Sequence, residues 1–529
     1  MIDFIKQRLL SRKLYIILSL SLFISACDKN FEKMNVNPNA FNEPVIKNLF
    51  SMSIVNIAGV GDDRDWGNGM YAGGIMQYFA SLDQHMSGEK YLYNPGYNDG
   101  FFQAGYQSHL KEVQQIISLI KDDPDQTNLY AMSRIMRVYA FHRITDFYGD
   151  VPYFDADKGF IDGTYKPKYD KQSDIYADML KELDESALLL DASKPNIGAA
   201  DFLYNGDVVQ WKRFAYSLML RLGMRLTKVD PASAESYVKK AIAGGVMQSN
   251  ADVAKLNHTN GTGLNWNWDS FYQNQEEIPV GSEGKGTSKL SKSFVDFLKD
   301  NNDPRLPFYA TLWQGNADPS QLPSSSAPEK QKGLPNGYDF TTIKTVIPNW
   351  TDNMYTEYSE INLNTIANMA APTIFQSYAE VELLLTEATI RGWDSGDPKI
   401  HYDKAVTAAM DMVSLFPGGV SISPSAITGY LTAHPFMSSN FDKQMEQIHY
   451  QYWVVHFFVD NIEGYSNWRR TGYPILVHVN YPGNETGGVT PRRLLYPQSE
   501  KILNTENYNA AVQIQGPDLY TTRVWWDKP

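Results

Sequence analysis

The sequence predicts a mainly α-helical fold in which pairs of helices stack against one another, and three observations lead to this prediction. Apolar residues recur at three- and four-residue spacing in a series of segments, as on the buried face of a helix. Small residues on one segment face large ones on the next, which is how tetratricopeptide-like hairpins pack. The chain is also 43% hydrophobic and 13% aromatic over 529 residues, enough to bury a large core.

The predicted helices come in consecutive pairs along the chain. They are Tyr130–Phe147, Gln172–Leu190, Val208–Thr227, Ala232–Ala243, Phe375–Gly392 and Tyr402–Leu415. In the last pair, Leu384 and Leu385 lie on one helix before Gly392 ends it, and Ala405 and Ala409 line the next. The small alanines allow the two helices to approach each other closely.

The N-terminal segment has the pattern of a lipoprotein signal peptide. Lys6, Arg8, Arg12 and Lys13 precede an uncharged apolar run from Leu14 to Ala26. This run is shorter than the roughly 20 residues that a spanning helix needs, so we predict that residues 1–26 are removed as a signal peptide.

Cys27 follows this run directly and is the only cysteine of the chain. Ile24, Ser25 and Ala26 before it resemble a bacterial lipobox. We therefore predict lipidation at Cys27, with a diacylglyceryl group on the sulfur and an acyl chain on the freed amine. Two or more such chains are enough for stable attachment to a membrane, and a lipidated Cys27 leaves no cysteine for an internal disulfide.

The rest of the chain is expected to form one domain behind a short tether. Residues 27–42 are polar and rich in turn-forming asparagines, which predicts a tether and a first loop. Residues 43–529 are predicted to form a single helical domain. Within it, the helical pattern lapses at about 245–365, where glycine, proline and tryptophan accumulate, and we expect a loop-rich insertion there. A shorter loop region is expected at residues 61–100.

The charge of the chain argues against nucleic acid as a partner. The formal net charge is −13, with 47 lysines and arginines against 60 acidic residues. A polyanion would be repelled at long range, and no basic stripe interleaved with aromatic residues offers a local exception. Neutral sugars or peptides suit this surface better.

Six separated motifs run along the chain in a fixed order. They are Phe31–Asn39 (FEKMNVNPN), Asn302–Leu306 (NDPRL), Tyr378–Ala388 (YAEVELLLTEA), Trp468–Pro474 (WRRTGYP), Pro491–Tyr508 (PRR, YP, Glu500 and NY) and Thr522–Asp527 (TRVWWD). In sequence and order they resemble the SusD/RagB family, and in particular its second SusD-like branch. The resemblance spans almost the whole chain.

The resemblance implies a fold and a partner. The fold is mainly α, built on about four tetratricopeptide-like units, with long irregular loops forming the ligand face. The partner is a SusC-like TonB-dependent transporter of the outer membrane, over whose mouth the lipoprotein would lie as a hinged lid. Members of the family bind glycans in most cases and peptides in some, so the motifs do not name the ligand.

Two loop clusters have the residue types that a glycan site needs. A sugar ring stacks its apolar face on an aromatic ring, while its hydroxyls bind carboxylates and amides. We expect the ligand-binding residues to come from an early cluster and a later one: Asp65, Trp66, Asn68, Tyr71 and Tyr93, then Trp266, Trp268, Trp313, Trp350 and Tyr355. Trp266 and Trp268 would share one face of an extended segment. Any one of these aromatic residues could instead be part of the core, where most such residues lie.

No sequence pattern indicates an enzyme, a metal centre or a cofactor. A glycosidase would need two carboxylates roughly 5 to 10 Å apart, and 60 acidic residues make such a pair easy to find. However, the motifs H-E-x-x-H and G-x-S-x-G are both missing. Asp155–Gly159 differs from a calcium loop in the position of its glycine and in lacking the closing Glu, so a turn is expected there.

The sequence therefore predicts a lipid-anchored binding protein that captures a glycan at the outer membrane, delivers it to the transporter and catalyses nothing. A peptide-capturing lipoprotein of the same fold is the first alternative. A surface glycan hydrolase is the second.

Overall fold

The computed structural model describes residues 45–59, 64–83, 86–259, 288–312, 325–368, 370–437 and 439–529. For residues 64–66, 160 and 353 it describes the backbone and not the side chains. The predicted signal peptide, Cys27 and the tether therefore lie outside the described residues. From Lys47 to Pro529 the chain forms one compact unit.

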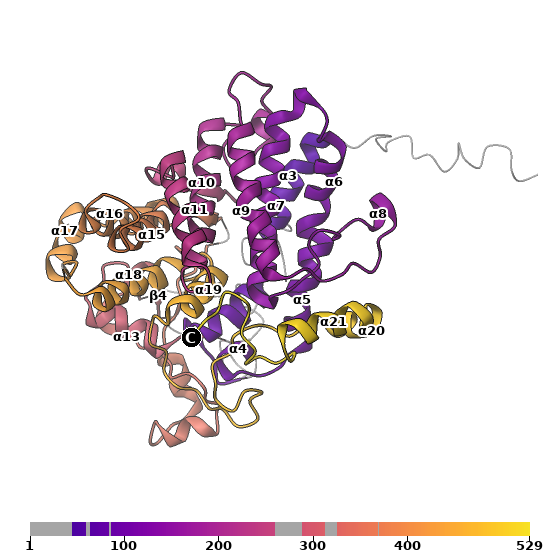
Figure 1. Cartoon of the computed structure of the whole chain (residues 1–529). Coiled ribbons are helices and arrows are strands. Elements are labelled where there is room, and N and C mark those ends of the chain that lie inside the picture. Colours follow the sequence, from indigo (N-terminus) through magenta and orange to yellow (C-terminus); the bar gives the residue numbers. More distant parts are fainter. Residues whose placement is uncertain are drawn as a thin grey trace, which may run out of the picture. The chain divides into compact units, whose positions relative to one another are not determined.

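Helices make up most of this unit (Figure 1). The α-helices are α3 (Ile46–Ile57), α4 (Ser87–Lys90), α5 (Pro95–Ala104), α6 (Lys111–Ile120), α7 (Thr127–Tyr148), α8 (Gly159–Asp162), α9 (Gln172–Leu189), α10 (Val208–Arg225), α11 (Pro231–Gly244), α13 (Lys292–Asp300), α14 (Leu306–Tyr309), α15 (Tyr378–Ile390), α16 (Pro398–Asp411), α17 (Pro424–Ala433), α18 (Phe441–His456), α19 (Asn461–Thr471), α20 (Gln498–Leu503) and α21 (Thr505–Gln515). Two π-helical segments, η1 (Arg64–Gly73) and η2 (Gly105–Leu110), and several short 3₁₀ turns complete the helical part.

Within the described ranges, three small antiparallel pairs of strands lie among the helices. They are β1 (Phe79–Ala80) with β3 (Lys289–Leu290), β2 (Ala254–Leu256) with β6 (Thr373–Gln376), and β4 (Ala310–Thr311) with β5 (Glu360–Ile361). Two of the pairs, β1 with β3 and β2 with β6, join the loop-rich part of the chain to segments outside it. Strands β4 and β5 both lie within that part.

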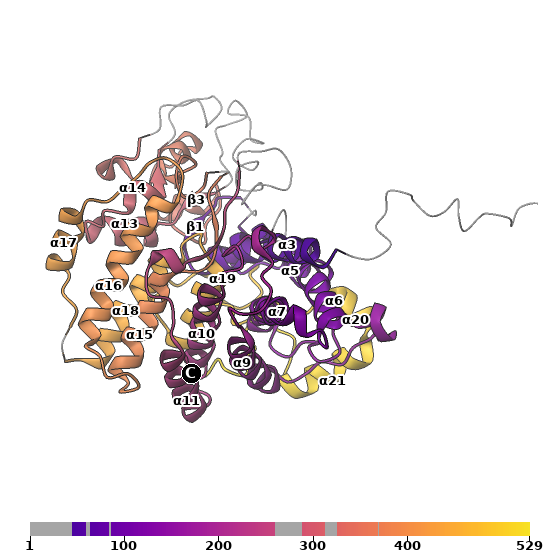
Figure 2. The same ribbon diagram turned by 90° about the horizontal axis from the view of Figure 1, so that it is seen from above.

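The long helices pack as hairpins, which confirms the predicted helical, tetratricopeptide-like fold class. Helix α7 packs against α9, α9 against α10, and α10 against α11. Further along the chain, α15 packs against α16 and α18, and α18 against α19. The first group stands side by side in Figure 1, and Figure 2 shows α15, α16 and α18 together.

Local sequence signals explain where these helices begin and why they come close. Asp207 caps α10 by accepting hydrogen bonds from the backbone N–H groups of Val209 and Gln210. In α11 and α16 an aspartate cap is followed by proline at the first helical position. At the end of α11, Gly244 lies so close to the Tyr216 ring that a Cβ atom would come within 2.4 Å of it. A glycine is required there for α10 and α11 to pack.

The two segments expected to be rich in loops also contain helices. The insertion at about 245–365 contains the nine-residue helix α13, and residues 61–100 include η1, α4 and part of α5. Helices α18 and α19 were not predicted at all. Their buried positions mix a few aliphatic residues with His, Gln, Tyr, Asn and Arg, so an apolar periodicity does not reveal them.

Candidate ligand-binding surfaces

Two residues of the early cluster expected to bind ligand are built into the interior. Asn68 and Tyr71 lie on η1 and are buried. The side-chain oxygen of Asn68 accepts a hydrogen bond from the backbone N–H of Ile462 at the start of α19. The Tyr71 hydroxyl lies 3.0 Å from the Tyr520 hydroxyl. The polar groups that suggested a loop site here bind other parts of the chain, so the expected surface position is not found for these two residues.

Tyr93 differs from its neighbours because its side chain is 36% exposed. It lies in the short connection between α4 and α5, next to the Asn94 cap of α5. Burial of part of the ring and the carboxylate of Asp99 raise the pKa of Tyr93, so its hydroxyl stays protonated at neutral pH and can donate a hydrogen bond. Ligand contact by Tyr93 remains a prediction, and the side chains of Asp65 and Trp66 lie outside the described part of the chain.

The later cluster divides in a similar way. Trp350 and Tyr355 are buried in a small core beneath the β1 region. The residues that form this core are Ala80, Leu82, Leu334, Ile343, Trp350, Tyr355 and Tyr358. Neither ring presents an open face, so the expected surface position is not found for them either. Trp266, Trp268 and Trp313 lie outside the described residues, and their contact with a ligand remains a prediction.

The glutamates of the Tyr378–Ala388 motif are buried and paired. Glu380 receives two hydrogen bonds from the Arg221 guanidinium, at 2.7 and 2.6 Å. Glu387 receives two from Arg470, both at 2.7 Å. Burial alone would raise the pKa values of both carboxyl groups, but their arginine partners hold these pKa values well below the usual range. The motif thus ties α15 to α10 and α19 through charged hydrogen bonds.

The Asn302–Leu306 motif has the same character. Arg305 is fully buried and binds both carboxylate oxygens of Asp303, at 2.9 and 2.6 Å. A further N–H of Arg305 donates to the side-chain oxygen of Gln451 on α18, at 2.8 Å. The turn is therefore locked onto a helix about 150 residues later in the chain.

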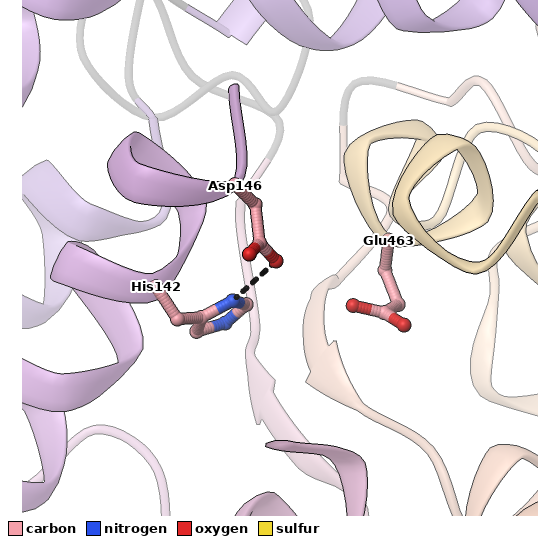
Figure 3. Close-up of side chains that lie close together, drawn as sticks. All are labelled: His142, Asp146 and Glu463. Carbon is pink, nitrogen blue, oxygen red and sulfur yellow. Dashed lines mark ion pairs between the residues drawn. The ribbon is translucent and has the colours of Figure 1, made fainter. Parts of the chain in front are cut away.

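A larger group of charges lies between α7, α10 and α19. Figure 3 shows His142 and Asp146 on α7 facing Glu463 on α19, with ligand atoms within 4.8 Å of one another. An imidazole and two carboxylates are residue types that can ligate a metal ion. However, an N–H group of Arg225 lies 2.5 Å from Glu463 and 3.5 Å from Asp146. The guanidinium already supplies the positive charge, so the residues do not fit a metal.

The protonation of this buried group follows from its contacts. Burial would raise the pKa of Asp146, but Arg225 and His142 hold it at about 2. The hydroxyl of Tyr176 and the indole N–H of Trp526 donate hydrogen bonds to the same carboxylate. Burial lowers the pKa of His142, so its imidazole is neutral at physiological pH. The cluster is a buried ionic network that joins helices. Asp146 Oδ2 and both ring nitrogens of His142 have no hydrogen-bond partner among the described residues, and Asp146 Oδ2 is held by the charge of Arg225 at 3.5 Å.

The C-terminal motifs complete this network. Arg470 pairs with Glu387 on α15, and Arg469 stacks on the Trp526 ring and donates to the backbone carbonyl of Asp146. Carboxylate pairs also hold the C-terminal segment, among them Arg492 with Asp527 and Arg493 with Asp518.

Comparisons with known proteins identify the family to which these motifs belong. A family model described as SusD-like and as starch-binding associating with outer membrane matches residues 38–497. The chain therefore belongs to the SusD-like family, whose members are binding proteins of the outer membrane. The motif residues described above are the buried ionic contacts of its scaffold.

Solved structures with the same fold cover almost the whole chain. A chitin-binding protein is 32% identical over 91% of this chain and all of its own, with a TM-score of 0.77. A Bacteroidetes SusD-like protein is 25% identical over 92% of this chain and all of its own, with a TM-score of 0.79. A chitin-binding SusD homologue from Flavobacterium johnsoniae is 24% identical over 91% of this chain and 98% of its own, with a TM-score of 0.74.

No protein with a curated description matches the chain. Among the described residues, no helix combines the length and the apolar character needed to cross a membrane.

Proposed function

We propose that the protein captures an oligosaccharide at the cell surface and delivers it to a SusC-like TonB-dependent transporter in the outer membrane. The observation that carries this proposal is the family match over residues 38–497. Lipidation at Cys27 would hold the protein at the membrane, where the transporter adds effective concentration to a modest affinity. The protein captures and delivers, and performs no bond cleavage itself.

The proposed ligand is a chain of N-acetylglucosamine units or a closely related neutral glycan. The support is the chitin-binding relative that shares 32% of its residues with this chain. Such a sugar offers an apolar ring face for aromatic stacking and hydroxyl and amide groups for hydrogen bonds. We propose that Trp66, Trp266, Trp268 and Trp313 supply stacking platforms on the ligand face, with Tyr93 beside them.

A glycan panel tests the capture role directly. Protein produced without residues 1–27 is titrated with oligosaccharides of two to six units, including N-acetylglucosamine oligomers, and heat is recorded in a calorimeter. The incubated sugars are then separated by chromatography. Saturable binding without shorter products is the expected result. Shorter products would establish the hydrolase alternative, and binding of peptides but of no sugar would establish the peptide alternative.

Single substitutions test the proposed platforms. Trp266→Ala and Trp268→Ala should each weaken binding by a factor of about two to ten, because stacking on an aromatic ring is worth on the order of 0.5 to 1.5 kcal/mol. Trp393→Ala is the matched control, since Trp393 is a partly exposed tryptophan just beyond α15 on the helical scaffold. Unchanged affinity in both loop variants would remove them from the site.

A further inference from the structure

A cavity of about 330 Å³ with a mixed polar and aromatic lining lies on the part of the scaffold formed by α13, α16, α17 and α18. These four helices gather together in both views (Figures 1 and 2). Aromatic rings supply much of the wall and amide, imidazole and carboxylate groups the rest; the lining residues are Phe297, Asn301, Tyr402, Tyr430, His434, Glu446, Gln447, Tyr450 and Gln451. None of them belongs to the loop clusters of the proposed ligand face. We name this cavity the α13–α18 pocket.

One wall of the pocket is held in place by a chain of hydrogen bonds. Arg305, fixed by Asp303, donates to the side-chain oxygen of Gln451. The Gln451 amide in turn donates to the Tyr430 hydroxyl at 2.9 Å. The centroids of the Tyr430 and His434 rings lie 4.6 Å apart. The Nε2 atom of His434 is hydrogen-bonded to the backbone carbonyl oxygen of Asn301 at 2.8 Å. This wall is set before any ligand arrives, which lowers the entropic cost of binding.

The opposite side offers an aromatic platform. The rings of Phe297 on α13 and Tyr450 on α18 are stacked, with centroids 5.0 Å apart and planes inclined by 20°. Both rings line the pocket and both are only partly buried. A sugar ring can extend this stack with its apolar face.

Tyr402 shows that the pocket has an unused hydrogen-bonding group. Its side chain is 3% exposed, lines the cavity and stacks on Phe436 with a centroid distance of 4.8 Å. Its hydroxyl makes no hydrogen bond with any residue that the structure describes. The hydroxyl oxygen is not among the fully buried polar atoms of the described residues, so it can be reached from the cavity. A ligand in the pocket therefore meets a free hydrogen-bonding group at the end of an otherwise buried side chain.

The chemistry of the lining selects the kind of ligand. The guanidinium of Arg305, which contacts the Gln451 wall, is committed to Asp303. Among the described residues no lysine or arginine lines the pocket, so the lining itself offers an anion no counter-charge. The carboxylate of Glu446 is paired with Lys443 at 2.6 Å and can still accept hydrogen bonds from hydroxyl groups. A cavity of this size lies near the lower end of the roughly 300 to 1,000 Å³ typical of ligand sites, which suits one or two sugar rings.

We propose that the α13–α18 pocket is a second saccharide-binding site, which holds one or two neutral pyranose units away from the loop-built ligand face. The Phe297 and Tyr450 rings stack on the sugar, and the Tyr402 hydroxyl exchanges a hydrogen bond with one of its hydroxyl groups. The proposal rests on the proposed function only in taking a saccharide as the ligand. The residues of the pocket and its place in the fold do not depend on the loop aromatic residues.

The test uses four variants and one set of probes. The purified full chain, in a detergent without a sugar headgroup, is titrated with N-acetylglucosamine oligomers of two to six units. Tyr402→Phe removes a single hydroxyl and Tyr450→Ala removes half of the platform. Trp266→Ala with Trp268→Ala disables the proposed loop site, and Tyr165→Phe, at an 82% exposed tyrosine outside the pocket, is the control. Thermal unfolding of every variant verifies that it is folded.

The expected result is two binding events for the unmodified chain. In Tyr402→Phe one of them weakens about five- to tenfold, because a hydrogen bond worth roughly 1 kcal/mol is lost. In Tyr450→Ala the same event disappears, and the event retained by the double loop variant is the one that Tyr402→Phe weakens. The control changes neither.

Three results would overturn the second site, and they separate it from the proposed function. If the Tyr402 and Tyr450 variants bind as the unmodified chain does while the double loop variant loses binding, the pocket is not a site and the capture role stands. If a single event is lost equally in all these variants, there is one site and not two. If the unmodified chain binds none of the oligomers, the second site and the proposed glycan ligand both fail.

Discussion

The ionic network between α7, α10, α15 and α19 and the α13–α18 pocket are both rich in polar side chains, yet they differ in how these side chains are satisfied. In the network, Glu380 and Glu387 each receive two hydrogen bonds from one guanidinium. In the pocket, the Tyr402 hydroxyl has no partner among the described residues and faces a cavity. The first region has the residue types of a catalytic or metal site and is closed, whereas the second has ordinary residues and is open.

This difference shows what kind of signal marks a binding surface. Buried carboxylates attract attention in a sequence, but their partners lie on helices more than 80 residues away and complete them. A closed network can stabilise and position helices, whereas a ligand needs an accessible surface and unpaired groups. Substitutions in the two regions should therefore separate stability from binding.

The largest expected effect is in the network. Arg221→Met leaves Glu380 buried without its cation, and breaking a buried pair in this way costs about 3 to 5 kcal/mol of the free energy of unfolding. Chemical denaturation measures this loss. The double variant Arg221→Met with Glu380→Leu should recover part of it, because no uncompensated charge remains at that pair.

Two observations control this prediction. Lys399→Met disrupts the exposed pair of Lys399 with Asp403 and should change stability by about 0.5 kcal/mol or less. Saccharide affinity measured under native conditions should be unchanged in folded Arg221→Met protein. A network variant with normal stability and lost affinity would place ligand binding in the network and reverse the comparison.

The scaffold could be predicted from the sequence because its signals are local. The predicted helix Gln172–Leu190 matches α9 to within one residue, and Val208–Thr227 extends α10 by two. Periodicity and capping residues suffice for such segments. The buried partners of Glu380 and Glu387 could not be predicted, because they come from distant helices that only the folded chain brings together.

The candidate site was predicted less well, also for physical reasons. Asn68 and Tyr71 have the composition of a glycan site, but η1 packs them against α19 and Tyr520. Tyr402 fits a helical apolar pattern and carries no separate signal in the sequence. Its role in a pocket depends on the meeting of four helices, and neither composition nor spacing contains that information.

Trp350 gives the next largest expected effect and tests its assignment to a core. Trp350→Ala should cost about 3 kcal/mol, because a large buried ring is replaced by a cavity. Trp350→Phe keeps most of the volume and should cost about 1 kcal/mol. The denaturation midpoint measures both changes. Normal stability combined with weaker saccharide binding in Trp350→Ala would show that Trp350 contacts the ligand and is not part of a core.

The smallest of the three effects concerns Asp157, a carboxylate that is not paired as those of the network are. It lies in the turn before α8, and its Oδ2 atom is buried without a hydrogen bond from any described residue. Burial and the neighbouring carboxylate of Glu112 raise its pKa from 3.8 to about 7. Because the folded-state pKa exceeds the unfolded-state pKa, the folded form favours the proton. Its stabilising contribution is complete below about pH 4 and is lost as the pH rises through 7.

Asp157→Asn removes this titration, so the variant should be more stable than the unmodified chain by on the order of 2 kcal/mol at pH 8, with a difference near zero at pH 4. Urea denaturation at pH 4, 6 and 8 measures that difference. Asp155→Asn in the same turn, where the carboxylate contacts Lys158 at 3.2 Å, should show no gain at pH 8. A gain in both variants, or a gain for Asp157→Asn that does not depend on pH, would mean that the gain does not come from the raised pKa of Asp157. Loss of stability in Asp157→Asn at pH 8 would mean that this carboxylate is satisfied as those of the network are.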